Sequence, residues 1–489
     1  MDVSTSISMQ AETKTASYTR VPKVISTFLW LLFLGTVAGL LADINAISSA
    51  VGEGIFRFTG FSLLIWMVVT FFSALVSSFA VHYLHGFKHH TRFMVLCVGF
   101  TLSVMLLVVS EHVLLLIFSW LIMGIFMSRL IGINSSWGEA REASTFTQRY
   151  FFTGSFFLAL GVLLLSFYSG AFTLTGLIAN LPEIPYPILL IAGLCIIMGA
   201  IVQSAMYPFH RWLLSAMTAP TPASALMHAG FVNGAGILLA LFASLLFSAN
   251  VMTVLFIIGG LTAIIAQFTK LLQVNVKQKL ACSTIAQMGF MIMQCGLGFF
   301  NAAVAHLILH GFYKAYLFLA SGEQIVHSNP QQPPKIEIRI VQAVIVGVAG
   351  LAGAFLFNLW TGKAVALDSG IFLTLIVAIT VGQATYNVVK AGALTILQKT
   401  FVAPLLFLVG IGIYALMYNG VTLMMADMPM IANPIPLTAV QVIFGVIFLL
   451  GFFIMKLGTY RKIPWLYVKL LNLSQPGANT VLRYKSTNS

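Results

Sequence analysis

Three titratable residues lie four apart in an otherwise apolar stretch of the sequence. His306, His310 and Lys314 occur in NAAVAHLILHGFYKAYLFLASGE, residues 301–323, which is long and apolar enough to cross a bilayer as a helix. At 3.6 residues per turn the three share one face and cover roughly 12 Å of the helix axis. A lysine near mid-membrane costs about 2.5–3.5 kcal/mol on insertion scales, so such residues usually face a bundle interior or a wet cavity. The spacing therefore predicts a proton wire rather than simple polar contacts between helices.

Metal binding is the other chemistry that this spacing allows. His306 and His310 have the helical spacing of metal ligands, but no acidic residue or cysteine lies within 302–322 to complete a site. We therefore expect no metal here. The sequence also has no Gly-rich phosphate loop and no nucleophile elbow, so we expect this chain to be a non-enzyme with no cofactor of its own.

The elements that position these residues must be membrane helices. The 489 residues are 59% hydrophobic and 8% charged, with a mean hydropathy of +0.99, which excludes a soluble globular protein. We expect an all-α polytopic membrane protein. Hydropathy predicts about fourteen spans, near residues 24–42, 60–81, 92–109, 111–131, 150–168, 187–207, 224–248, 251–270, 283–300, 302–322, 340–365, 371–391, 400–418 and 437–457.

The distribution of lysine and arginine sets the expected orientation. With the N-terminus inside, 22 of the 25 basic residues fall in inside segments and Arg57 falls outside. Lys314 and Lys363 belong to membrane segments. This asymmetry predicts an even number of spans with both termini cytoplasmic. It also explains the net charge of +13 as a topology signal, so we expect membrane lipid and no nucleic acid as a partner.

Two segments show interruptions at matching places of two five-helix blocks. The first is 187–217, which contains Pro208, and the second follows a Gly-rich run that ends at Gly362 and Lys363. Interrupted helices at matching positions are typical of inverted-repeat transporters and their ion paths. The division that we expect is an N-terminal tail with two peripheral spans at 1–91, two inverted five-helix repeats each with a discontinuous helix at 92–248 and 251–394, two C-terminal spans at 395–457, and a cytoplasmic tail at 458–489.

Two further basic residues stand near the expected wire. His228 enters the bilayer one turn after a proline-marked turn, and a core histidine hydrogen-bonded to a neighbour is an equally good interpretation of it alone. Lys277 marks the cytoplasmic mouth of a helix, where basic residues belong in any case. Each therefore has both a structural and a proton-path interpretation.

Three motifs resemble the antiporter-like proton-conducting subunits of NADH dehydrogenase, Mrp antiporters and membrane-bound hydrogenases. They are YPFHRWLLSAMTAPTPASALMHAG at 207–230, KLACSTIAQMGF at 279–290 and HLILHGFYKAYLFLASG at 306–322, and the similarity extends over about 82–325. The resemblance implies that the family's proton-path residues fall on the histidines and lysines at these positions. They are His228, Lys277, His306, His310 and Lys314, with Lys363 within one position of a further family lysine.

Two departures from the family pattern are informative. The family pairs a glutamate on one helix with a lysine on the first broken helix, and Leu121 and Gln203 stand at those positions here. The absence of both charges makes physical sense. Loss of only one would leave its partner as an unpaired buried charge, which destabilises a protein by roughly 3–5 kcal/mol. The first half therefore resembles an electrostatically silent channel.

This pattern is most similar, within the family, to the membrane subunits of the DAB complexes, which accumulate dissolved inorganic carbon in bacteria. The resemblance implies a soluble zinc-containing partner, DabA, on the cytoplasmic face, and a multi-pass location in the bacterial inner membrane. It implies that this chain conducts a cation, expected to be the proton, and couples its gradient to CO2 hydration in the partner. The alternatives are a proton or sodium translocating subunit of a respiratory, hydrogenase or Mrp complex, and a plain membrane anchor, which the intramembrane lysines disfavour.

Overall fold

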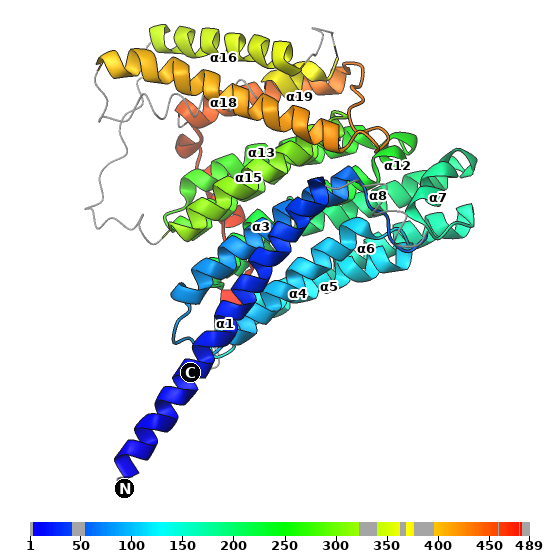
Figure 1. The fold of residues 1–489 in the computed structure, drawn as a ribbon. Helices are drawn as coiled ribbons and strands as arrows, with labels where there is room; N and C mark the ends of the chain where they lie inside the picture. Colours follow the sequence, from blue (N-terminus) through cyan, green and yellow to red (C-terminus); the bar gives the residue numbers. More distant parts are fainter. Residues whose placement is uncertain are drawn as a thin grey trace.

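A computed structural model describes residues 3–41, 54–321, 340–361, 368–375, 396–457, 459–478 and 480–481. These residues form helices joined by short connections (Figure 1). The N-terminal half contains α1 (Val3–Leu41), α3 (Gly60–Tyr83), α4 (His90–Val109), α5 (Val113–Ile131), α6 (Gly138–Ser169), α7 (Leu174–Ala179) and α8 (Tyr186–Gln203). The middle contains α9 (Arg211–Ser215), α10 (Thr221–Ala229), α11 (Gly234–Leu241), α12 (Ala243–Ser248), α13 (Met252–Leu272), α14 (Val276–Gly296) and α15 (Phe300–Leu319). The C-terminal part contains α16 (Ile340–Thr361), α18 (Ile396–Met424), α19 (Ala439–Leu457) and α20 (Pro464–Leu473).

The chain is an all-helical polytopic membrane protein. Ten stretches among the described residues are long and apolar enough to cross a membrane. They are Arg20–Leu41, Gly60–Tyr83, His90–Val109, Val113–Ile131, Gly138–Ser169, Tyr186–Gln203, Thr221–Leu241, Met252–Leu272, Phe300–Leu319 and Leu405–Met424. The expected span at 371–391 lies mainly outside the described residues.

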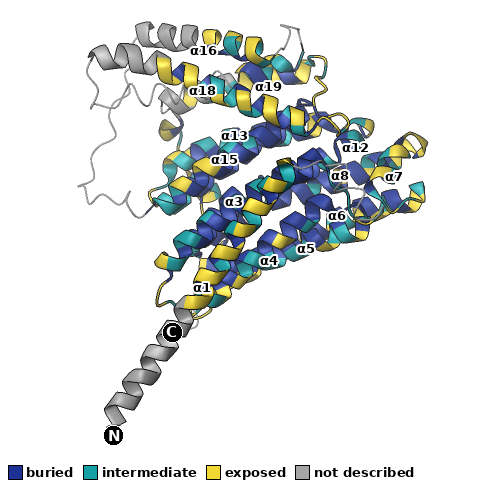
Figure 2. Cartoon of the chain, viewed as in Figure 1, coloured by how far each residue is buried: buried dark blue, intermediate teal, exposed yellow. Residues whose placement is uncertain are grey.

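Burial separates central helices from peripheral ones. The stretch Thr221–Leu241 is 89% buried, whereas only 17% of Arg20–Leu41 is buried. Figure 2 shows the same contrast, with α1 and α18 largely exposed and dark blue residues gathered between α3, α8, α13 and α15. Helices α10 and α11 therefore occupy the centre of the bundle, and α1 runs along its outside (Figure 1).

Helices α13 and α14 pack with their backbones in direct contact. A Cβ atom added to Gly259 of α13 would lie 2.5 Å from the amide nitrogen of Met293 and 2.6 Å from the carbonyl oxygen of Gly289. One added to Gly289 would lie 2.7 Å from the amide nitrogen of Ala263. Small residues that permit such approach are the main source of helix association in lipid, where no hydrophobic force pulls helices together. These glycines thus fix α14 against α13.

Two membrane segments of the N-terminal and middle regions are interrupted. Helix α8 ends at Gln203 and α9 begins only at Arg211, which places a break around Pro208 as the sequence predicts. The second break separates α10 from α11 at Gly230, through a short 3₁₀ turn at Phe231–Asn233. The sequence analysis did not predict this second break. The interruption expected at Gly362 lies outside the described residues.

The C-terminal segment is tied to the first broken segment and to α13. The Nε2 atom of His210 lies 2.8 Å from the carbonyl oxygen of Leu473, and Gln273 Nε2 donates to the carbonyl of Ser474 at 2.9 Å. The amide of Gly477 donates to Ser215 Oγ at 3.0 Å. These hydrogen bonds hold the end of α20 and the residues after it against α9, against the break before α9 and against the end of α13.

Candidate functional site

Lys314 lies at the centre of the site with its side chain completely buried. Its ammonium donates to the carbonyl oxygen of Leu280 on α14 at 3.0 Å. That carbonyl also accepts the hydroxyl of Thr284 at 3.1 Å. One neutral acceptor compensates a buried ammonium poorly, and among the described residues no second oxygen accepts from the other N–H groups of Lys314. The position therefore favours a water molecule as a further hydrogen-bond partner of this amine.

His228 and His310 are buried beside Lys314 and have unused nitrogen atoms. Both ring nitrogens of each histidine lack a hydrogen-bond partner among the described residues. His228 stacks on Phe318, with ring centroids 4.3 Å apart and planes 15° apart. His310 lies one helical turn before Lys314 on α15, and α10, which carries His228, packs against α15. Buried polar atoms are normally paired, so these nitrogens indicate places for water.

His306 lies on the same face of α15, one helical turn before His310. Its ring centroid lies 6.3 Å from that of His310, and its side chain is half-buried. Direct proton transfer needs heavy atoms within about 3 Å, so this gap requires at least one intervening water. The expected arrangement of three residues on one face is therefore present, with its spacing suited to a hydrated chain.

Lys277 reaches inward instead of extending into solvent. Its ammonium donates to the carbonyl oxygen of Ala219, just before α10, at 2.8 Å. Helix α10 carries His228, and His228 interacts electrostatically with both Lys277 and Lys314. Lys277 thus connects the beginning of α14 to the helix that presents His228.

A proton path that enters at Lys363 and runs through Lys314, His310, His306 and His228 to Lys277 differs from the order in which the described residues lie along the site. A path from outside through Lys314, then His310 and His306, would put Lys314 outermost. The bond to Leu280, one turn from Lys277, instead places Lys314 at the Lys277 end, with His306 about 12 Å farther away along α15. The physical reason is that α14 and α15 form an antiparallel pair, so the late residues of α15 lie beside the early residues of α14.

The site contains basic groups without acidic ones. The sequence has no aspartate or glutamate between Glu183 and Glu323, a region that includes every helix just described. Within the described residues no three His, Cys, Asp or Glu side chains gather as metal ligands would. The arrangement can hold and pass protons, because lysine and histidine both titrate by losing a positive charge.

Three polar side chains near the site were missed by the sequence analysis. Asn233 donates to the carbonyl of Ala229 at 2.7 Å and leaves its own buried oxygen unpaired. Gln278 and Gln294 also have buried oxygens without a partner among the described residues. In the sequence, these residues differ from their surroundings only as amide side chains within apolar runs. That pattern is weak evidence for a functional site, because amides often form hydrogen bonds between membrane helices.

The positions that lack the family's charge pair are neutral and packed. Gln203 is buried and its amide approaches the carbonyl of Phe231 at 3.4 Å. A Cβ atom on Gly234 would lie 3.6 Å from both Gln203 and Trp120, the neighbour of Leu121. Lys363 lies outside the described residues and remains a prediction.

We expect Gln203→Met to preserve ion conduction to within about fivefold, because the hydrogen bond that it removes is long and contributes at most about 1 kcal/mol. Ion flux in vesicles measures this directly. A loss of flux as deep as that of a Lys314 variant would show that the first half conducts.

Comparison with known proteins identifies the matched domain. Residues 110–335 match the family model of the NADH:quinone oxidoreductase/Mrp antiporter transmembrane region. The chain is 33% identical over 317 residues to the probable inorganic carbon transporter subunit DabB of Bacillus anthracis, covering 63% of this chain and 62% of that protein. It is 34% identical over 282 residues to NADH-quinone oxidoreductase subunit L of Pseudomonas aeruginosa, covering 56% of this chain and 45% of that protein.

A solved structure shares the fold. The structure of the Mrp complex from Dietzia sp. DQ12-45-1b superimposes with a TM-score of 0.62 at 19% identity, over 97% of this chain and 59% of that one. The alignments with the two relatives named above each span less than two thirds of the relative's length. Residues 110–335, a little under half of the chain, thus resemble the transmembrane region of the NADH:quinone oxidoreductase/Mrp antiporter family.

Proposed function

We propose that this antiporter-like subunit conducts protons and energises inorganic-carbon uptake. The observation that carries the proposal is a line of basic residues, with His228, Lys314 and His310 buried and with Lys277 and His306 half-buried at its ends. The line contains no carboxylate. Keeping a lysine at this depth is costly, and membrane proteins retain such residues mainly on ion pathways. The similarity to DabB, named as an inorganic carbon transporter subunit, supports carbon uptake as the process that is driven.

The coupling follows from the chemistry of CO2 hydration. That reaction yields bicarbonate and one proton, so removal of the proton draws the reaction forward. We place the hydration in a DabA-like zinc subunit on the cytoplasmic face, with this chain supplying ion movement and no catalysis. Protons travel along the basic line, and Lys363 is the proposed residue at its outer end.

The proposed architecture retains the arrangement expected from the sequence. It has fourteen spans in the bacterial inner membrane, with both termini cytoplasmic and two inverted five-helix repeats at 92–248 and 251–394. The breaks after Gln203 and after Ala229 support a pathway in this region, because irregular backbone at membrane depth is tolerated where it lines a cavity.

A second candidate is a proton or sodium translocating subunit of a respiratory, hydrogenase or Mrp complex. The similarity to NADH-quinone oxidoreductase subunit L and the fold shared with the Mrp structure favour it. Neutral Leu121 and Gln203 count against it, since a glutamate and a lysine occupy these positions in the pattern that those subunits follow.

Co-expression with the product of the neighbouring gene in a bacterium lacking carbonic anhydrase tests the proposal. We expect the pair to permit growth in air, and we expect an uncoupler to abolish intracellular carbon accumulation. Purification of the chain with many redox subunits, without rescue by any zinc-containing partner, would support the second candidate and refute the first.

A further inference from the structure

Helix α20 presents an exposed face that the proposed ion path does not use. Its opposite side packs against the protein, where Leu470 is buried in a small cluster with Phe268 of α13 and Tyr460. The exposed face is formed by residues three to four apart, as one face of a helix requires. They are Trp465, Val468, Lys469 and Asn472.

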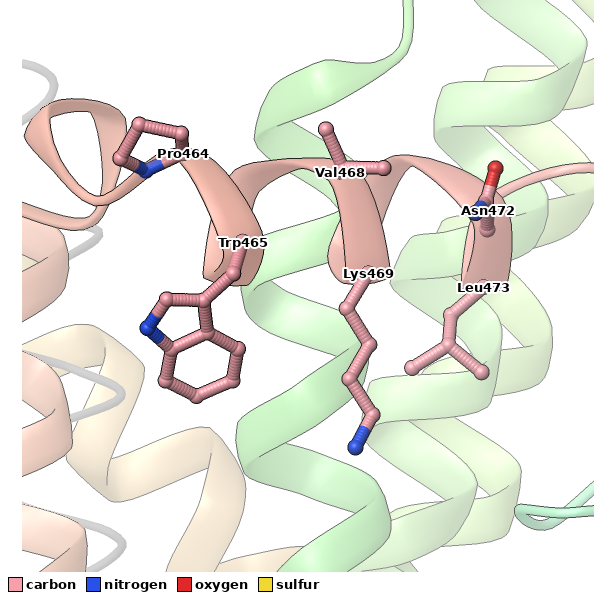
Figure 3. Close-up of a pocket in the computed structure, with 6 residues that line it drawn as sticks. All are labelled: Pro464, Trp465, Val468, Lys469, Asn472 and Leu473. Atoms are coloured by element: carbon pink, nitrogen blue, oxygen red, sulfur yellow. The ribbon is translucent and has the colours of Figure 1, made fainter.

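This face forms an open hollow of about 520 Å³, lined by Pro464, Trp465, Val468, Lys469, Asn472 and Leu473. Figure 3 shows Trp465 and Lys469 projecting from the same side of the helix, one turn apart. The side chain of Trp465 is 68% exposed and that of Val468 is 52% exposed. An exposed indole next to an ammonium is the combination that membrane-surface helices present to lipid.

The position of α20 in the chain places it at the level of a membrane surface. It follows the apolar helix α19, which ends at Leu457, after six residues. The sequence predicts a membrane span at residues 437–457, which covers α19. Its packed face rests on Phe268, one turn before the end of membrane helix α13 at Leu272. A ten-residue helix at the ends of two membrane helices lies at the boundary between lipid and water, where tryptophan is enriched.

The region around α20 is positively charged, and this charge favours anionic lipid. The sequence contains no aspartate or glutamate after Asp427. Arg461, Lys462 and Lys469 are exposed on or just before α20. An ammonium or guanidinium attracts anionic headgroups at a membrane surface. A basic helix that also exposes tryptophan and valine therefore complements an anionic phospholipid better than a zwitterionic one.

We propose that the exposed face of α20 binds an anionic phospholipid in the leaflet that it borders. Lys469 contacts the phosphate, Trp465 lies at the level of the ester groups, and Val468 packs against the start of an acyl chain. This proposal does not depend on the identity of the conducted ion.

Fluorescence in lipid nanodiscs tests this proposal. The full chain is placed in zwitterionic lipid that contains equal mole fractions of either brominated phosphatidylglycerol or brominated phosphatidylcholine, with bromine near the headgroup. The emission of Trp465 is obtained as the difference between the native chain and Trp465→Phe. We expect the brominated anionic lipid to quench this emission at about fivefold lower mole fraction, the enrichment that one cation at a membrane surface provides.

Two matched variants identify the cause of the preference. Lys469→Gln is expected to abolish the preference for anionic lipid, whereas Lys88→Gln, which changes another exposed lysine, is expected to preserve it. Equal quenching by the two brominated lipids would overturn the proposal. Absence of quenching by either lipid would also overturn it, and would assign this face to water or to a protein partner.

Discussion

Lys314→Ala is expected to abolish inorganic-carbon-dependent growth in air while the complex still assembles. The variant removes the buried ammonium that lies one helical turn from His310 and donates to the carbonyl of Leu280. Stability should change less than function, because removing a poorly compensated buried charge offsets part of the cost of the cavity left behind. Growth at air-level CO2, with detection of the assembled complex by size-exclusion chromatography, measures both effects.

Lys88→Ala is the control for Lys314→Ala. Lys88 is an exposed lysine in the loop before α4 and is not part of the basic line. It should grow as the native protein does. Full growth of the Lys314→Ala strain in air would contradict the proton-relay account. Loss of the assembled complex would instead show that Lys314 acts mainly in packing.

Gly259→Ala is expected to lower stability more than substitution of any peripheral glycine. The added methyl group would meet backbone atoms of Met293 and Gly289, which cannot move aside as a side chain can. Overpacking of this kind costs typically about 1–3 kcal/mol. Since α14 also supplies the carbonyl of Leu280, its displacement should weaken the contact with Lys314 as well. Thermal unfolding of the purified protein in detergent measures the loss.

Gly35→Ala provides the matched control for this substitution. Gly35 lies on α1, and a Cβ atom there would meet nothing within 4 Å. This variant should unfold at the same temperature as the native protein or slightly higher, because alanine is the better helix former. If Gly259→Ala and Gly35→Ala unfolded at the same temperature, the close contact between α13 and α14 would not limit stability.

Part of the geometry of the basic line could be predicted from the sequence, whereas the role of its residues remains a prediction. Spacings of four place His306, His310 and Lys314 on one helix face in any α-helix, and that face is present in α15. The break near Pro208 was also predictable, because proline removes a backbone hydrogen bond. Both features depend on local chemistry alone.

The remaining features depend on contacts between distant segments. The carbonyls that accept from Lys314 and Lys277 belong to Leu280 and Ala219, and a backbone carbonyl carries no residue-specific signal. The break at Gly230 was missed because glycine is common within continuous membrane helices. The order of the line required the antiparallel pairing of α14 with α15, which spacing along one helix does not give.

In the proposed proton path, ordered water joins these basic groups into a relay. A density map of the complex that resolves ordered water tests it most directly. We expect water within hydrogen-bonding distance of three groups. They are the ring nitrogens of His228 and of His310, which have no partner among the described residues, and the ammonium of Lys314. Those nitrogens packed against carbon atoms, with no water between them, would contradict it.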